Sequence, residues 1–140
     1  MAAQLAGHLK AGDIVFLDGD LGTGKTTWVC AMLTVLCASE AGSSPTFQVI
    51  QSYEGRHKIY HCDAYRLSTE DILDLDLAYY VTEDSLFIAE WGNRIPPEVM
   101  RPDYHIQLAF GQTPDERLVH ITVQSPDMQV VLQKLTLDSL

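Results

Sequence analysis

Residues 19–27 read Gly-Asp-Leu-Gly-Thr-Gly-Lys-Thr-Thr, and this stretch decides the fold class. It fits G-x-x-x-x-G-K-[ST], the pattern of the phosphate-binding P-loop. The glycines allow backbone conformations that turn several N–H groups toward one point. Lys25 would bring positive charge to the β- and γ-phosphates, and Thr26 would place a hydroxyl on Mg²⁺ where a helix begins. The stretch therefore predicts a site for a nucleoside triphosphate.

The sequence on both sides of this loop has the periodicity that a P-loop requires. Residues 13–18, Asp-Ile-Val-Phe-Leu-Asp, form a short apolar run typical of a strand. After the loop, apolar residues recur at helical spacing: Trp28, Val29, Met32, Leu33, Val35 and Leu36. The alternative, a glycine-rich turn with a surface lysine, does not explain why strand, loop and helix follow one another in register.

Length and composition limit the remaining possibilities. With 140 residues, 46% of them hydrophobic, the chain suits a single domain that spans residues 1–140. A net charge of −10 argues against sequence-independent binding of nucleic acid, which needs a basic surface. No apolar run reaches the length of a membrane span, and the first residues lack the layout of a signal peptide. Three cysteines without a C-x-x-C pair favour a reduced, cytoplasmic protein.

Further elements follow from local patterns. Residues 1–10 are expected to hold a short helix, and residues 126–135 a last helix with Val130, Val131 and Leu135 facing inward. Ser68 and Asp71 form a capping-box pattern at the start of another helix, and 79–81 are expected to be helical. Cys30 and Cys37 are interpreted as buried small residues on one helix face. Strands are predicted over 47–53 and 58–63 as a hairpin, over 86–90, and over 104–110 and 118–123 as a pair.

Two carboxylates stand where a P-loop protein needs them. Glu90 ends the apolar run 86–89, which is typical of the acid that completes a magnesium shell, and Asp63 ends the strand before it. One could hold the metal while the other orients or deprotonates a water. The alternative for each is a strand-end cap or a partner for an arginine; Arg66 could pair with Asp63. His61 alone is more often a structural histidine.

Acidic residues dominate the stretch between Arg66 and Arg94, which contains no Lys, Arg or His. Two interpretations stay open: a solvated acidic face, or a docking surface for a basic partner that charge would steer. The acidic residues are Glu70, Asp71, Asp74, Asp76, Glu83, Asp84 and Glu90.

Four motifs together resemble the TsaE family, the small bacterial P-loop ATPases required for threonylcarbamoyladenosine synthesis in tRNA. They are the P-loop at 19–27, Ser-Pro-Thr-Phe at 44–47, His-Cys-Asp-Ala-Tyr-Arg-Leu at 61–67, and Glu90-Trp91. The resemblance runs from about residue 12 to about residue 123. A strand and a threonine that the family places before this region, near the nucleotide base, have no counterpart, so we name no adenine-contacting side chain.

The resemblance implies an α/β, P-loop NTPase-like three-layer fold, with a mixed, mainly parallel central sheet and an antiparallel C-terminal strand pair. It also implies ATP and Mg²⁺ as cofactors, with Lys25, Asp63 and Glu90 catalytic and Thr26 and Glu90 as metal ligands. Ser44 to Thr46 resembles a mobile, switch-like loop. The nucleotide-binding residues would be Leu21, Gly22, Thr23, Gly24, Lys25, Thr26, Thr27 and Thr46.

The function implied is slow ATP hydrolysis that depends on TsaB and TsaD. TsaD transfers the threonylcarbamoyl group to adenosine 37 of tRNAs that read codons beginning with A, and TsaE itself does not modify the tRNA. A different hypothesis is a nucleotide-gated binding subunit in which hydrolysis is incidental. A small-molecule kinase is disfavoured because no arginine-rich lid segment is present. A GTPase is disfavoured because no Asn-Lys-x-Asp stretch is available to bind guanine.

Overall fold

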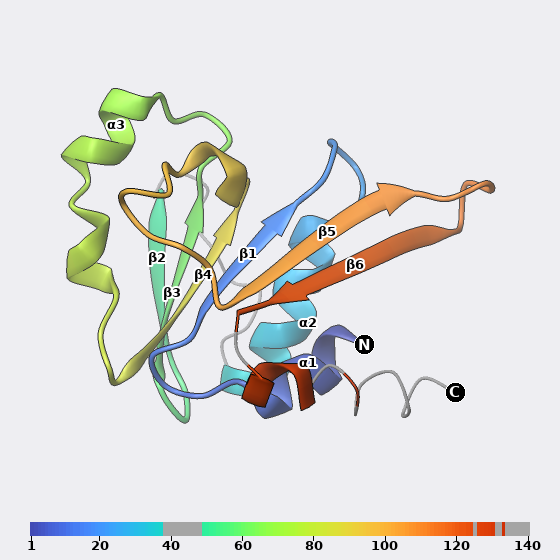
Figure 1. The fold of residues 1–140 in the computed structure, drawn as a ribbon, viewed down its shortest axis with the longest axis horizontal. Helices are drawn as coiled ribbons and strands as arrows, with labels where there is room; N and C mark the ends of the chain where they lie inside the picture. The colour runs from blue at the N-terminus through green and yellow to red at the C-terminus, as the bar shows by residue number, and fades with distance from the viewer. Residues whose placement is uncertain (38–48, 125, 131–132, 134–140) are drawn as a thin grey trace.

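A computed structural model of the chain describes residues 1–37, 49–124, 126–130 and 133. Its centre is a six-stranded sheet with the strand order β2-β3-β4-β1-β5-β6 (Figure 1). The strands are β1 (Ile14–Asp18), β2 (Ile50–Glu54), β3 (Lys58–Asp63), β4 (Ser85–Glu90), β5 (Tyr104–Phe110) and β6 (Arg117–Val123). The helices are α1 (Ala2–His8), α2 (Lys25–Cys37) and α3 (Thr69–Asp74), with 3₁₀ turns η1 (Leu77–Tyr80) and η2 (Gly92–Arg94).

The sheet is mixed and mainly parallel. The four central strands β3, β4, β1 and β5 run parallel to their neighbours. The edge strands are antiparallel: β2 pairs with β3, and β6 pairs with β5. This arrangement confirms the predicted fold class, including the β2–β3 hairpin and the antiparallel C-terminal pair.

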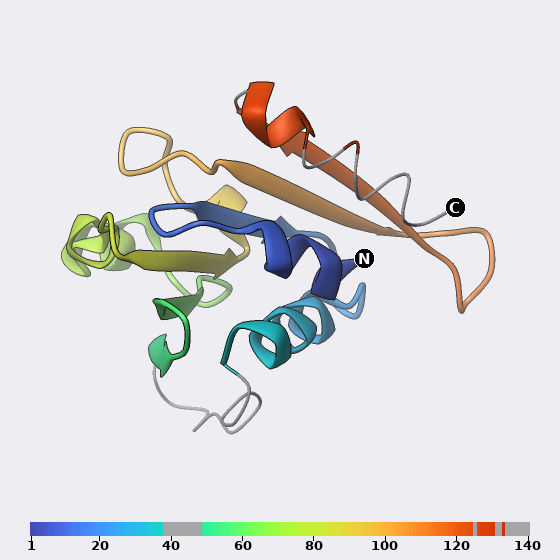
Figure 2. The same cartoon turned by 90° about the horizontal axis from the view of Figure 1, so that it is seen from below.

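Alternate residues of the central strands fill two separate cores. On one face Val15, Leu17, Leu86 and Ile88 pack against α1 and α2. On the other face Phe16, Phe87 and Ala89 join Ile72 of α3 and Leu77 of η1. All six residues of β4 are buried, as expected for a central parallel strand covered on both sides. The two clusters make the three-layer arrangement of helices and sheet that is visible in Figure 2.

Several local predictions are confirmed at the level of single bonds. Ser68 caps α3 by accepting a hydrogen bond from the backbone N–H of Asp71, and the Asp71 carboxylate accepts one from the backbone N–H of Ser68. The first helix lies within residues 1–10 as expected, and α2 begins at Lys25 directly after the P-loop.

Other expectations need correction. Cys30 is exposed, whereas Cys37 is buried, because the two lie on nearly the same side of α2 but only the second is covered by the core. Val130 is 49% exposed and does not face inward, although residues 126–130 are helical. The helical turn at residues 77–80 ends before Val81. Residues 47–48, Val131 and Leu135 lie outside the described part of the chain. Within the described residues, no helix is long and apolar enough to cross a membrane.

Candidate nucleotide site

The P-loop connects β1 to α2 at the carboxyl end of the central strands (Figure 1). Gly19, Gly22 and Gly24 all have positive φ, of 152°, 82° and 105°. At Gly19 a Cβ atom would lie 2.5 Å from the backbone oxygen of Leu108, so the passage of the loop beside β5 requires glycine. The loop therefore closes around the first turn of α2, where helix N–H groups favour an anion.

Lys25 is folded back over this loop. Its side-chain Nζ donates hydrogen bonds to the carbonyl oxygens of Gly19, at 2.6 Å, and Asp20, at 2.9 Å. The same Nζ lies 4.3 Å from the centre of the Trp91 ring, and the residue is only 5% exposed. The ammonium group is thus held at the loop without a carboxylate partner among the described residues. A phosphate group could replace its two carbonyl contacts.

Thr26 and Glu90 meet across the site. The Thr26 hydroxyl donates a hydrogen bond of 2.9 Å to Glu90 Oε1, although the residues are 64 positions apart in the chain. The other carboxylate oxygen, Oε2, lies 2.8 Å from Nε2 of His61 on β3. Because a carboxylate only accepts, the imidazole Nε2 carries the proton of this bond. The side chains of His61 and Glu90 are 13% and 5% exposed.

These contacts act on the ionisation of Glu90. Burial by itself raises its pKa, whereas the hydrogen bonds from His61 and Thr26 and the charges of His61 and Lys25 lower it. The result is a pKa below the usual value of a glutamate. Glu90 is therefore a carboxylate at neutral pH, as a magnesium ligand must be.

Asp63 lies beside Glu90 but in a different environment. The two are register partners in the parallel pair of β3 and β4, so both leave the sheet at the same edge. Asp63 is exposed, and its Oδ1 accepts a hydrogen bond from the backbone N–H of Tyr65. No ion pair joins Asp63 to Arg66 among the described residues. Asp63 is thus free to face solvent or a ligand.

The remaining predicted nucleotide contacts differ in exposure. Thr23 is buried, and its hydroxyl donates to the carbonyl oxygen of Asp20, which braces the loop from within. Leu21 is 63% exposed and Thr27 is also exposed, so both side chains are accessible to solvent. Thr46 and the rest of the 44–46 loop lie outside the described residues.

An aromatic and cationic cluster borders the site. Sequence patterns did not reveal this cluster. Trp91 has a left-handed backbone conformation, with φ 59° and ψ 42°, which costs a non-glycine residue about 1–3 kcal/mol. The centre of its ring lies 4.9 Å from the centre of the Tyr65 ring. The Arg94 guanidinium lies 5.5 Å from the Tyr65 ring and 5.6 Å from the Trp91 ring. The left-handed residue turns the chain after Glu90 so that Trp91 covers Lys25. Residue type alone carries no signal for such a conformation.

The donor set fits Mg²⁺ held together with a nucleotide. No group of three or more His, Cys, Asp or Glu side chains that could hold a metal exists among the residues described. Thr26 and Glu90 supply one hydroxyl and one carboxylate, which are hard oxygen ligands of the kind Mg²⁺ prefers. Such a pair depends on phosphate oxygens and water to complete the shell.

Comparison with known proteins identifies the family. The model of the family described as "Threonylcarbamoyl adenosine biosynthesis protein TsaE" matches residues 1–119. The chain belongs to the TsaE family. This confirms the resemblance drawn from the four sequence motifs.

Individual relatives agree with this assignment. The "tRNA threonylcarbamoyladenosine biosynthesis protein TsaE" of Nostoc sp. is 41% identical over 93 residues, which cover 63% of this chain and only 57% of that relative. The protein of the same name from Rickettsia bellii is 37% identical over 124 residues, 86% of this chain and 85% of the relative. The crystal structure of YdiB from Bacillus subtilis matches with a TM-score of 0.71 at 25% identity, covering 99% of this chain and 86% of that one.

Proposed function

We propose that this TsaE-family chain is an ATP-binding, slowly ATP-hydrolysing subunit of the system that makes threonylcarbamoyladenosine in tRNA. In this proposal residues 1–140 act as a single P-loop ATPase domain. The observation that carries it is the 2.9 Å contact between Thr26 and Glu90. It joins the hydroxyl of the P-loop to the acid of the neighbouring strand, the two groups that a magnesium nucleotide needs at one point.

Each residue of the site has a distinct part in this proposal. The backbone N–H groups of residues 21–27 cradle the phosphates, and Lys25 moves from its carbonyl contacts to the β- and γ-phosphates. Thr26 and Glu90 hold Mg²⁺, which neutralises charge on the phosphate oxygens when it is bound. Asp63, exposed beside Glu90, orients or deprotonates the attacking water.

The partners we propose are TsaB and TsaD, with TsaD carrying out the transfer to adenosine 37. The matched relatives are named for threonylcarbamoyladenosine biosynthesis in tRNA, which supports a role in that biosynthesis. The net charge of −10 supports a role through proteins, since contact with tRNA phosphates requires basic groups. The acidic residues between 66 and 94 would then steer a basic partner surface.

The alternative is a nucleotide-gated binding subunit in which hydrolysis is incidental. A variant at Asp63 distinguishes this alternative from the ATPase proposal. Among the described residues the Asp63 side chain makes one hydrogen bond, accepted from the backbone N–H of Tyr65, so Asp63→Ala should leave the fold and ATP binding intact. If hydrolysis drives the cycle, this variant should bind ATP but fail to support tRNA modification. A variant that binds ATP, does not hydrolyse it and still supports full modification would establish the gated subunit instead.

The first experiment measures ATP hydrolysis by the chain alone and then with purified TsaB and TsaD. Glu90→Ala is assayed in parallel, with Asp115→Ala as a control that removes an exposed acid in the turn between β5 and β6, outside the acidic stretch. We expect stimulation by the two partners that Glu90→Ala abolishes and Asp115→Ala retains. Absence of stimulation, with ATP binding intact, would contradict the ATPase proposal.

A further inference from the structure

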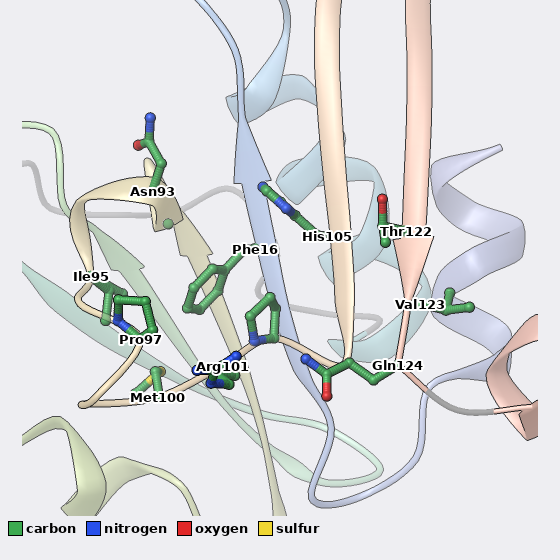
Figure 3. A pocket seen from close by; sticks show the side chains of 12 residues that line it. Phe16, Asn93, Ile95, Pro97, Met100, Arg101, His105, Thr122, Val123 and Gln124 are labelled. Carbon is green, nitrogen blue, oxygen red and sulfur yellow. The ribbon is translucent and has the colours of Figure 1, made fainter.

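A cavity lies on the sheet face opposite α1 and α2, and none of the P-loop residues lines it. It has a volume of about 340 Å³ and opens between the segment 92–102 and the strands β5 and β6 (Figure 3). The buried ring of Phe16 forms its floor, and Ile95, Pro97 and Met100 form one wall. Across from them stand His105 and Thr122, which are register partners in the β5–β6 pair. A volume of this size is in the range of small-molecule sites.

The apolar wall is held in place before any ligand arrives. The backbone N–H of Asp103 donates to the carbonyl of Ile14, and the Asp103 carboxylate accepts from the N–H of Ile14, both at 2.8 Å. Val99 N–H bonds back to the carbonyl of Pro96 in a tight turn. Prolines at 97 and 102 restrict the backbone further. A preformed wall lowers the entropic cost of binding.

Arg101 brings an unmatched positive charge to this cavity. It is exposed and lines the cavity, and no hydrogen bond or ion pair to it occurs within the described residues. Among the described residues Lys58 is the only Lys or Arg in an ion pair, so Arg101 is one of several without a carboxylate partner, but it is the only Lys or Arg that lines this cavity. A guanidinium group pairs readily with a carboxylate through two parallel hydrogen bonds. Arg101 therefore favours an acidic group at its end of the cavity.

The opposite end offers a different polar group. His105 Nε2 lies 2.5 Å from Asp18 Oδ2, and Asp18 Oδ1 accepts from the backbone N–H of Asn93. Since the buried Asp18 carboxylate accepts from Nε2, Nδ1 is the ring nitrogen that remains available to a ligand. In Figure 3, His105 and Arg101 lie on opposite sides of the Phe16 ring. The cavity thus combines a cation, an apolar floor and a polar ring nitrogen.

We propose that this cavity is a binding site for a small organic acid, distinct from the nucleotide site. The ligand class has a flat apolar body that covers Phe16, a carboxylate that pairs with Arg101, and a hydrogen-bonding group directed to His105. This site is separate from the P-loop chemistry, so it stands or falls independently of the ATPase proposal.

Indole-3-acetate is a suitable probe because it carries a carboxylate, an aromatic body and an N–H donor. Isothermal titration of the full chain should give one saturable site with a Kd of about 1 mM or below. Neutral indole-3-acetamide should bind at least 10-fold more weakly. Arg101→Gln should weaken the binding of indole-3-acetate by at least 10-fold. Arg56→Gln, the same charge change on the β2–β3 hairpin, should change this affinity less than twofold.

Thr122→Phe tests the location. Thr122 is exposed on β6, so a phenyl ring should be tolerated by the fold while filling the cavity, and it should abolish binding. The proposal is overturned if indole-3-acetate does not saturate, or if neither Arg101→Gln nor Thr122→Phe changes its affinity. It is also overturned if the probe fails to bind while Thr122→Phe weakens association with TsaB and TsaD, because the cavity would then be a protein contact.

Discussion

We predict that His61 determines the affinity of the proposed magnesium site without touching the metal itself. Its Nε2 donates to Glu90 Oε2 at 2.8 Å, while Thr26 donates to Oε1 at 2.9 Å. The two bonds fix the carboxylate from both sides. His61→Leu removes one of them with little change in side-chain volume, and it leaves every proposed ligand in place.

The structure sets the size of the expected effect. Glu90 is 5% exposed, so water cannot easily replace the lost donor, and an unsatisfied buried acceptor costs about 1–3 kcal/mol of the free energy of unfolding. Groups that orient metal ligands typically change metal affinity by about 10- to 100-fold. We therefore expect Mg²⁺ affinity of the ADP complex to fall within that range, or about 1.4–2.7 kcal/mol in binding free energy.

The assay is a titration of the ADP complex with Mn²⁺ followed by electron paramagnetic resonance, with Mg²⁺ as competitor. ADP affinity without metal should change less than about threefold, because His61 lies on the side of Glu90 away from the P-loop hydroxyl. His120→Leu, an exposed histidine on β6, is the matched control and should leave both affinities unchanged. Equal metal affinity in His61→Leu and the unmodified chain would refute the positioning role.

Four further outcomes follow from local geometry. Gly92→Ala should lower the free energy of unfolding by about 1–3 kcal/mol, since the new Cβ would lie 2.3 Å from the buried ring of Phe16. Gly7 lies in α1 with open space around it, so Gly7→Ala should raise the free energy of unfolding by about 0.5 kcal/mol. A change of the same sign in both variants, measured by urea unfolding, would contradict this packing. Ser68→Ala should cost about 1 kcal/mol in the same assay through loss of the α3 cap, and no change would exclude a capping role. Because folding lowers the pKa of Glu90, its ionisation stabilises the fold above the usual glutamate pKa, and this stabilisation is lost on acidification. In urea unfolding between about pH 5 and pH 3, the free energy of unfolding should therefore fall less steeply in Glu90→Gln than in the unmodified chain.

Much of the site could be predicted because its signals are local. The P-loop, the strand before it and the helix after it occupy one continuous stretch, so glycine spacing and apolar periodicity are sufficient to predict them. The capping box of α3 likewise depends on residues three positions apart. Glu90 and Asp63 were recognised as candidate acids because each ends an apolar strand. Their proposed roles remain predictions.

Other features depend on which strands become neighbours. Cys30 was expected to be buried because periodicity assigns a helix face without saying how much of it the sheet covers. The Asp18–His105 pair joins residues 87 positions apart, and it exists only because β5 lies next to β1. Neither residue belongs to a motif.

The sequence by itself determined the P-loop unit, the alternation of strands and helices, and the family, because each is written in short-range spacing. Only the tertiary structure decided that His61 holds Glu90, that the left-handed Trp91 covers Lys25, and that a cavity with Arg101 opens beside β5. The physical reason is that these contacts follow from strand order and register. Those are set by burial of both sheet faces at once, which no local pattern specifies.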